Sequence, residues 1–275
     1  MKKYLLISLG IFSVFLIPSG YYFLKQIGEN RKISQYLSES DLGNSSDWDK
    51  AKQLSQRLRS DFEINESKFV SLNMSNRPFL RETAGYLLDI KEGQCGEGAR
   101  VLVNLLNEAG YDATRITLYN KYLDAAHTLV SLKIGSNEYF IDTINTSNEI
   151  NDFINQNQIT SKSFKIVKYD SDVSKRTSDY FSLKEMANSD QENTENIFFR
   201  KFKYYSYEAI PYTKLFKVLG LDVRMLNFDR PPRGISSLAE KPYLLLSIVW
   251  LMLAICVFIF TSGLTYFFYR KTAKT

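Results

Sequence analysis

Long uncharged, apolar stretches lie at both ends of the chain. One runs from Tyr4 to Leu24 and the other from Pro242 to Tyr269. A helix needs about 20 consecutive apolar residues to cross the hydrocarbon core of a bilayer, so each stretch is long enough to do so. Trp250 and the aromatic cluster at 266–269 suit the interfacial zone of a membrane. The pattern predicts transmembrane helices at 4–24 and 242–269.

The first apolar stretch has a second interpretation, as a cleaved signal peptide, because Lys2 and Lys3 precede it. Pro18-Ser19-Gly20 is followed at once by Tyr21-Tyr22-Phe23-Leu24, without a clear Ala-x-Ala cleavage pattern. We therefore expect an uncleaved signal anchor.

The segment between these stretches has the periodicities of an α+β domain. Residues 25–45 are polar and are expected to form a linker, and Ser46 is expected to be the N-cap of the first helix of a core at 46–150. Apolar residues at helical spacing predict three helices, over Trp48–Phe62, Pro78–Asp89 and Glu97–Ala109. Alternating and β-branched residues predict three strands, over Ala113–Tyr119, Thr128–Ile134 and Tyr139–Ile144.

The chain becomes more polar after this core. Residues 151–228 are expected to complete the soluble domain, with a strand-like run at Phe164–Tyr169. Phe198–Tyr205 mixes aromatic and basic residues, and an edge strand with solvated lysines is favoured over a membrane-surface contact. Residues 229–241, which contain Pro231-Pro232, are expected to form a stiff linker to the last span.

Charge changes this picture by giving it a direction. The formal net charge is +5, and all 30 acidic residues lie within 25–241. Five basic residues lie outside that range, so the central segment is neutral and the excess charge sits at the ends. Basic residues favour the cytoplasmic side, so we expect both termini there and the central segment outside the cytoplasm. A neutral domain also argues against nucleic acid as a partner.

Cysteine and histidine are scarce, which narrows the possible chemistry. Cys256 lies in the last apolar stretch, so Cys95 is the one cysteine of the central segment, and His127 is the one histidine of the chain. A disulfide framework is therefore excluded there, and one Cys with one His does not make a zinc site. We expect neither a metal nor a cofactor.

Cys95 and His127 are instead placed as a cysteine enzyme would need them. Cys95 follows Gly93-Gln94 at the start of the third predicted helix, where free N–H groups and the helix dipole stabilise a thiolate. His127 opens a predicted strand and Asp142 lies in the next one. An imidazole that moves protons and a carboxylate that orients the ring would complete a Cys-His-Asp triad.

Residues from about Glu82 to Asn145 resemble the core of the transglutaminase-like superfamily. The likeness lies in the turn at 93–96 opening a helix, the sequence Gly110-Tyr111-Asp112-Ala113-Thr114-Arg115 leading into a strand, His127 before an apolar strand, and Asp142. Thr128-Leu129-Val130 after His127 replaces the family's frequent Ala-Trp-Val, and Thr143 stands where Pro is frequent.

The resemblance implies a papain-like fold, in which a helix carrying Cys95 packs on an antiparallel sheet carrying His127 and Asp142. It implies a cysteine peptidase, amidase or acyltransferase that forms a thioester on Cys95 with a peptide, protein or other amide substrate. Water and an amine both stay open as acceptor. The alternative is a non-catalytic binding or scaffold protein of a membrane complex, for instance in cell-surface polymer assembly.

Three further residues concern the surroundings of this site. Gln94 and Tyr86 are the candidates for a second oxyanion donor beside the Cys95 amide. Glu97 and Arg100, one helical turn apart, are expected to form a surface ion pair.

Overall fold

The computed structural model describes residues 2–40, 42–64, 82–120, 125–143, 165–168, 202–207, 223–226 and 230–272. Within these residues the chain is α+β, with six α-helices and an antiparallel sheet of four strands. It divides into two compact units. One comprises residues 1–31 and 241–275, and the other residues 32–240.

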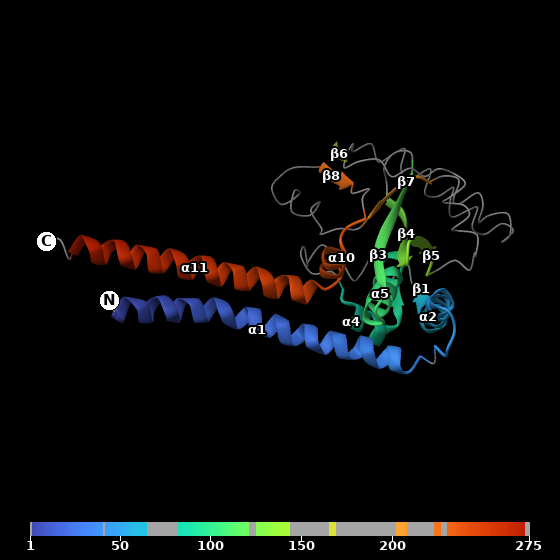
Figure 1. Cartoon of the computed structure of the whole chain (residues 1–275), viewed down its shortest axis with the longest axis horizontal. Coiled ribbons are helices and arrows are strands. Elements are labelled where there is room, and N and C mark those ends of the chain that lie inside the picture. The colour runs from blue at the N-terminus through green and yellow to red at the C-terminus, as the bar shows by residue number, and fades with distance from the viewer. Residues whose placement is uncertain are drawn as a thin grey trace. The chain divides into compact units, whose positions relative to one another are not determined.

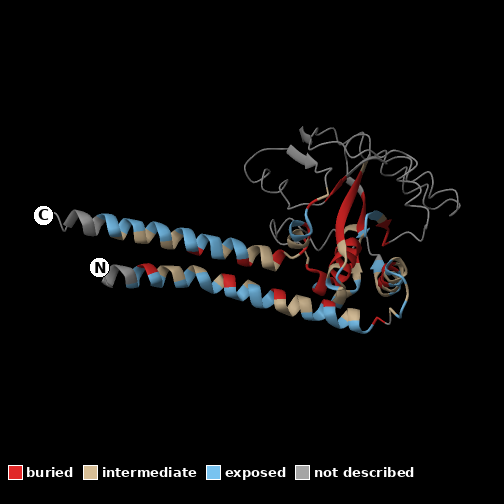
Figure 2. Cartoon of the chain, in the orientation of Figure 1, coloured by how far each residue is buried: buried red, intermediate tan, exposed pale blue. Residues whose placement is uncertain are grey.

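The first unit contains α11 (Pro242–Thr272) and most of α1 (Lys2–Ser38), whose last residues belong to the second unit. Both helices are long and apolar enough to cross a membrane, at Leu6–Ser38 and Pro242–Phe267. The hydroxyls of Ser19 and Ser247 each donate to the other residue's carbonyl at 2.9 Å. Ring pairs extend this contact in antiparallel order, with Phe12–Phe258, Phe15–Trp250 and Tyr22–Tyr243. Outside it, much of both helices is exposed (Figure 2), for example Ile17 at 71% and Phe260 at 67%.

The polar linker expected at 25–45 is wrong for residues 25–38, which continue α1. Side-chain hydrogen bonds between residues four apart, Gln26 to Asn30 and Gln35 to Glu39, stabilise this helical stretch. Ile33 is buried in the core of the second unit, with Leu37 packed beside it. The charged residues on the outer face conceal this short apolar stripe in the sequence.

Helix α2 (Asp47–Asp61) confirms the first predicted helix to within one residue at each end. Its N-cap is Ser46, as expected, and the Ser46 hydroxyl accepts the Asp49 N–H at 3.2 Å. Helix α4 (Ala84–Ile90) begins after its own N-cap, Thr83, so the predicted start at residue 78 is wrong for residues 82 and 83. Residues 78–81 lie outside the described part of the chain.

The main sheet has the strand order β5-β4-β3-β7, and all of its pairings are antiparallel. Its strands are β3 (Asp112–Asn120), β4 (Ala125–Ile134), β5 (Asn137–Ile141) and β7 (Phe202–Tyr207). They confirm the first two predicted strands, whereas the third ends at Ile141, so the prediction is wrong for residues 142 and 143, and residue 144 lies outside the described part of the chain. The predicted edge strand is also present as β7. A small separate sheet pairs β6 (Lys165–Lys168) with β8 (Val223–Leu226).

Helix α5 (Cys95–Glu108) lies against β3 and β4, and Figure 1 shows it beside the long central strands. Most of its buried residues are apolar, and the same core takes in side chains from α2, α4 and the sheet. The buried colouring in Figure 2 is concentrated in α5 and these strands. The fully buried members of this core include Leu54, Leu58, Leu87, Leu102, Leu105, Leu106 and Leu132.

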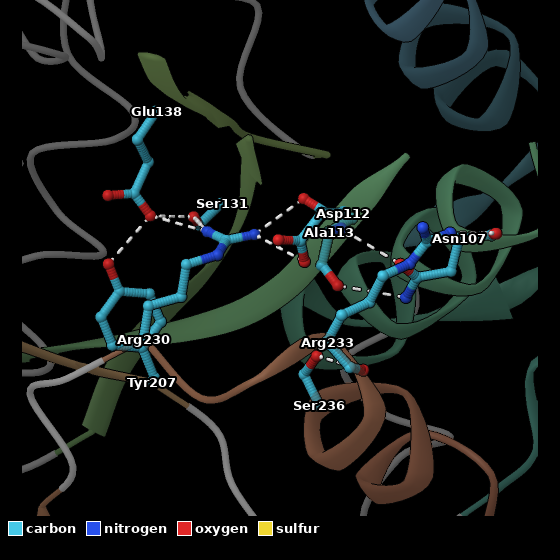
Figure 3. A network of polar contacts seen from close by, with 9 residues as sticks. All are labelled: Asn107, Asp112, Ala113, Ser131, Glu138, Tyr207, Arg230, Arg233 and Ser236. Atoms are coloured by element: carbon cyan, nitrogen blue, oxygen red, sulfur yellow. Dashed lines mark hydrogen bonds and ion pairs between the residues drawn. The ribbon is translucent and has the colours of Figure 1, made fainter. Parts of the chain in front are cut away.

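The stiff linker expected at 229–241 is wrong for residues 230–240, which are part of the second unit. Figure 3 shows the Arg230 guanidinium between three strands, donating to Glu138 Oε1 at 2.8 Å and to the Asp112 carbonyl at 2.7 Å, and contacting the Ser131 hydroxyl. Tyr207 donates to the same Glu138 oxygen at 2.8 Å. Residues Arg233–Ala239 then form helix α10, which packs on β3.

Candidate active site

Cys95 is the first residue of α5. Gln94 before it has an extended backbone, takes the N-cap position, and donates its N–H to Glu97 Oε2 at 3.3 Å. Such capping fixes the residue at which a helix begins. The first amides of a helix have no carbonyl partner within it, so Cys95 lies where a negative charge is favoured.

Gly93 holds this turn close to its neighbours. It lies in the two-residue strand β2 (Glu92–Gly93), which pairs in parallel with β1 (Glu63–Ile64). A Cβ at position 93 would lie 2.6 Å from the Glu97 Cβ and 2.7 Å from the Phe62 ring. Only glycine permits this approach, and the position of Cys95 depends on it.

His127 and Asp142 meet at one end of the sheet. His127 belongs to β4, and Asp142 is the residue directly after β5, the neighbouring strand. The Nε2 atom of His127 lies 2.7 Å from Oδ2 of Asp142, and both side chains are buried. Because Asp142 occupies Nε2, Nδ1 is the ring nitrogen left for the hydrogen bond between His127 and Cys95. The structure therefore brings the three predicted residues together.

Electrostatics favour an ionised cysteine. Burial raises the pKa of the Cys95 thiol, and the charge of Glu97 adds to this rise. The hydrogen bond and charge of His127, together with a hydrogen bond to the Thr128 backbone, lower the pKa by more, so it falls below its ordinary value. Burial lowers the pKa of His127, whereas the charge and hydrogen bond of Asp142, with a contribution from Cys95, raise it to about 10. Both shifts stabilise a thiolate–imidazolium pair.

Two supporting contacts could not be found from the sequence. The Ser55 hydroxyl of α2 donates to the backbone carbonyl of Asp142 at 3.4 Å, and the Thr128 backbone hydrogen-bonds to Cys95. Each joins segments far apart along the chain or uses a backbone group, so no local pattern marks it. The contacts hold Asp142 and Cys95 from outside the three residues.

The two candidate oxyanion donors differ in placement. Gln94 is next to Cys95 at the helix start, whereas Tyr86 lies on α4 with 37% of its surface exposed. Gln94 is therefore the one that lies next to Cys95, at the N-cap of α5.

The expected surface ion pair between Glu97 and Arg100 is wrong, because both residues are buried. Arg100 instead donates through Nε to Glu240 at 3.2 Å, and Arg115 of β3 donates to the other carboxylate oxygen at 2.6 Å. Glu240 follows α10, about 140 residues along the chain from Arg100, so a spacing rule within one helix could not identify it. This cluster joins α5, β3 and the end of α10.

Metal binding is not supported by the described part of the chain, in which no group of three or more His, Cys, Asp or Glu side chains is placed to hold an ion.

Comparisons with protein-family models, with curated proteins and with solved structures found no match for this chain. Its function is therefore inferred from the residues and geometry of the site. The arrangement of Cys95, His127 and Asp142 carries that inference.

Proposed function

We propose that this chain is a membrane-anchored cysteine enzyme that cleaves or transfers an amide acyl group through a thioester on Cys95. The observation that carries the proposal is the position of His127. Its ring has two hydrogen-bond partners, which are the Asp142 carboxylate, 2.7 Å from Nε2, and the Cys95 thiol. A nucleophile beside a base that a third group orients is the recurring arrangement of covalent catalysis.

The core would be of the transglutaminase-like, papain-like type. In support, the nucleophile opens a helix that packs on an antiparallel sheet, and the other two groups lie on adjacent strands of that sheet. The chain order Cys95, His127, Asp142 agrees with the resemblance between residues 82–145 and that superfamily. The fold by itself does not define an activity, so the proposal depends on the site.

The first half-reaction follows from the ion pair. The Cys95 thiolate attacks the carbonyl carbon of an amide, a carbon–sulfur bond forms, and negative charge moves to the carbonyl oxygen. The backbone N–H of Cys95 would stabilise that oxygen, and Gln94 is the candidate for a second donor. His127 donates its proton to the departing nitrogen as the carbon–nitrogen bond breaks, which leaves a thioester and a neutral imidazole.

The second half-reaction restores the site. Water or an amine gives a proton to His127 and attacks the thioester carbon, and the carbon–sulfur bond breaks to return the thiolate beside an imidazolium. Asp142 stays ionised throughout and keeps the ring oriented. The acceptor decides between hydrolysis and transamidation, and the described residues are compatible with both.

We also propose that α1 and α11 cross a membrane as a helical hairpin, with the soluble unit outside the cytoplasm. The antiparallel contact between Ser19 and Ser247, the exposed apolar side chains and the excess of basic residues at both chain ends support this topology. Substrates would then be periplasmic or extracellular amides.

Alkylation of Cys95 across pH tests the chemical proposal. The full chain in detergent, with Cys256→Ala so that Cys95 is the one thiol, is treated with iodoacetamide. We expect a midpoint below about 8.5, the value of an ordinary thiol, and its rise in His127→Ala, which removes the group that lowers the Cys95 pKa most. A midpoint near that of an ordinary thiol, unchanged by His127→Ala, would reject the catalytic pair.

Sidedness is tested in intact cells. A membrane-impermeant activity-based thiol probe should label the Cys256→Ala chain, and adding Cys95→Ser should abolish the labelling. Labelling that requires permeabilised cells would place the soluble unit in the cytoplasm and overturn the proposed topology.

A further inference from the structure

Gly98 of α5 is in close contact with Thr143, the residue directly after Asp142. A Cβ built at position 98 would lie 2.9 Å from the Thr143 hydroxyl oxygen and 3.3 Å from the Thr143 Cβ. Gly98 is one helical turn after Cys95, and its N–H donates to the Gln94 carbonyl at 2.9 Å. The segment that carries Asp142 therefore touches the helix that carries Cys95 at a point where only glycine fits without a shift.

Thr143 is buried, with 6% of its surface exposed, and its hydroxyl oxygen has no hydrogen-bond partner within the described part of the chain. A buried hydroxyl without a partner is unfavourable, so a hydrogen bond within the described residues does not explain why threonine occupies position 143. The Thr143 side chain fills the space that a side chain at position 98 would occupy.

The same short segment is also held from the other side. Ser55 of α2, itself buried, donates to the backbone carbonyl of Asp142 at 3.4 Å. The backbone at 142–143 thus lies between α2 and α5. The Asp142 carboxylate extends from this segment to His127, and its Oδ2 atom lies 2.7 Å from Nε2 of the ring.

From these contacts we propose that Gly98 and Thr143 are positioning residues, whose contact fixes how far Asp142 lies from α5 and so aligns its carboxylate with His127. The inference rests on the proposed function, in which that carboxylate keeps His127 charged beside the Cys95 thiolate. Neither Gly98 nor Thr143 touches the reacting atoms. They act through Asp142.

Glycine is otherwise a poor choice within a helix, where alanine is favoured. Gly98→Ala would therefore be expected to strengthen α5 if the contact with Thr143 did not matter. With the contact, the added methyl group must displace Thr143, and Asp142 moves with it. Loss of the aligned carboxylate lowers the share of protonated His127 and, with it, the share of thiolate near neutral pH.

The experiment compares Gly98→Ala, Thr143→Ala and the double variant, each in the full chain with Cys256→Ala. The measured quantity is the pH dependence of iodoacetamide alkylation of Cys95. We expect Gly98→Ala to move the midpoint upward and to slow alkylation at pH 6 by roughly tenfold, the effect of one unit of pKa. Thr143→Ala alone should also move the midpoint upward, though by less, because it removes the side-chain groups that contact Gly98 and set the distance of Asp142 from α5.

The double variant decides whether the contact itself is responsible. Removing the Thr143 hydroxyl and methyl groups leaves only its Cβ, 3.3 Å from the new methyl group, which a shift of a few tenths of an ångström accommodates. The wild-type midpoint should therefore return. This rescue also covers a Gly98→Ala chain that does not fold, since the double variant must then both fold and recover the midpoint.

Two outcomes overturn the inference. One is a folded Gly98→Ala chain with the wild-type midpoint, and the other is a double variant that does not recover. Failure of the proposed function gives a different result. Cys95 would then be alkylated with the pH dependence of an ordinary thiol even in the chain that keeps Gly98.

Discussion

His127 Nε2 lies 2.7 Å from Asp142 Oδ2, and both side chains are buried. Asp142 is the largest of the influences that raise the pKa of His127, which reaches about 10. The ring should therefore stay protonated at pH 8, where an unperturbed imidazole with a pKa near 6.5 is neutral. Because the chain has one histidine, isotope-labelled histidine gives a single imidazole signal whose titration in detergent reads this directly.

The matched change for this titration is Asp142→Asn. It keeps the size of the side chain and removes the charge, so the His127 pKa should fall toward or below its ordinary value, because burial then dominates. An imidazole that titrates alike in both chains would show that Asp142 does not set its charge.

Ser19 and Ser247 should be close enough to cross-link when both are cysteine. Their hydroxyl oxygens are 3.2 Å apart, and a modest rotation brings two sulfur atoms to the length of about 2.05 Å that a disulfide requires. In a chain with Cys95→Ser and Cys256→Ala, oxidation should join the two helices. The product is detected by cleaving the soluble unit and finding both ends of the chain together on a non-reducing gel.

Ser13→Cys paired with Ser247→Cys is the control. Ser13 is exposed, and its hydroxyl donates to the Leu9 carbonyl of its own helix. This pair should not cross-link under the same oxidation. Equal yields from the two pairs would contradict the antiparallel contact at Ser19.

Glu240→Gln should strongly destabilise the chain. The carboxylate accepts from Arg100 at 3.2 Å and Arg115 at 2.6 Å, and all three side chains are almost fully buried. Removing one partner of a buried ionic cluster costs about 3–5 kcal/mol. The free energy of unfolding in detergent measures the effect. Asp89→Asn, which breaks the exposed pair with Lys32, should change it by no more than about 1 kcal/mol.

Gly93→Ala tests the packing beneath the nucleophile. The new methyl group would meet Phe62 and Glu97 at less than 3 Å, so we expect a loss of about 1–3 kcal/mol in the free energy of unfolding. Gly234 in α10 has open space around it, and Gly234→Ala should be neutral or stabilising by up to about 1 kcal/mol. Similar losses at the two positions would show that backbone freedom, not crowding, explains Gly93.

The site was accessible to sequence analysis because its groups are rare and its elements are locally marked. A lone histidine, a lone cysteine after Gly93, and a hairpin turn at Gly135 together define which strands carry which group. The contacts that hold these groups, such as Ser55 on Asp142, depend on tertiary packing and leave no periodic trace. Gly98 is similar, since its importance depends on a residue 45 positions later.

The errors in the fold have a common cause. The polarity of residues 25–38 and the two prolines of residues 230–240 indicate linkers, but the fold brings partners to charged groups of both segments, for example Asp89 to Lys32. Arg230, for example, forms ion pairs with Asp112 and Glu138, and Glu240 with two arginines. A charged residue in a sequence is therefore exposed to solvent only where the fold does not bring an opposite charge to it.

The positions of Arg230 and Glu240 in the sequence also mean that both are synthesised long after the residues of the site. Cys95, His127 and Asp142 have all been made by residue 142, but the groups that bind α5 and the sheet together are complete only at residue 240. At ribosomal rates of 5–20 residues per second, the 98 intervening residues take about 5–20 s. During that interval a nascent chain holds every reactive group without its full support. The Cys95 thiol is therefore synthesised well before the contacts that support α5 are complete.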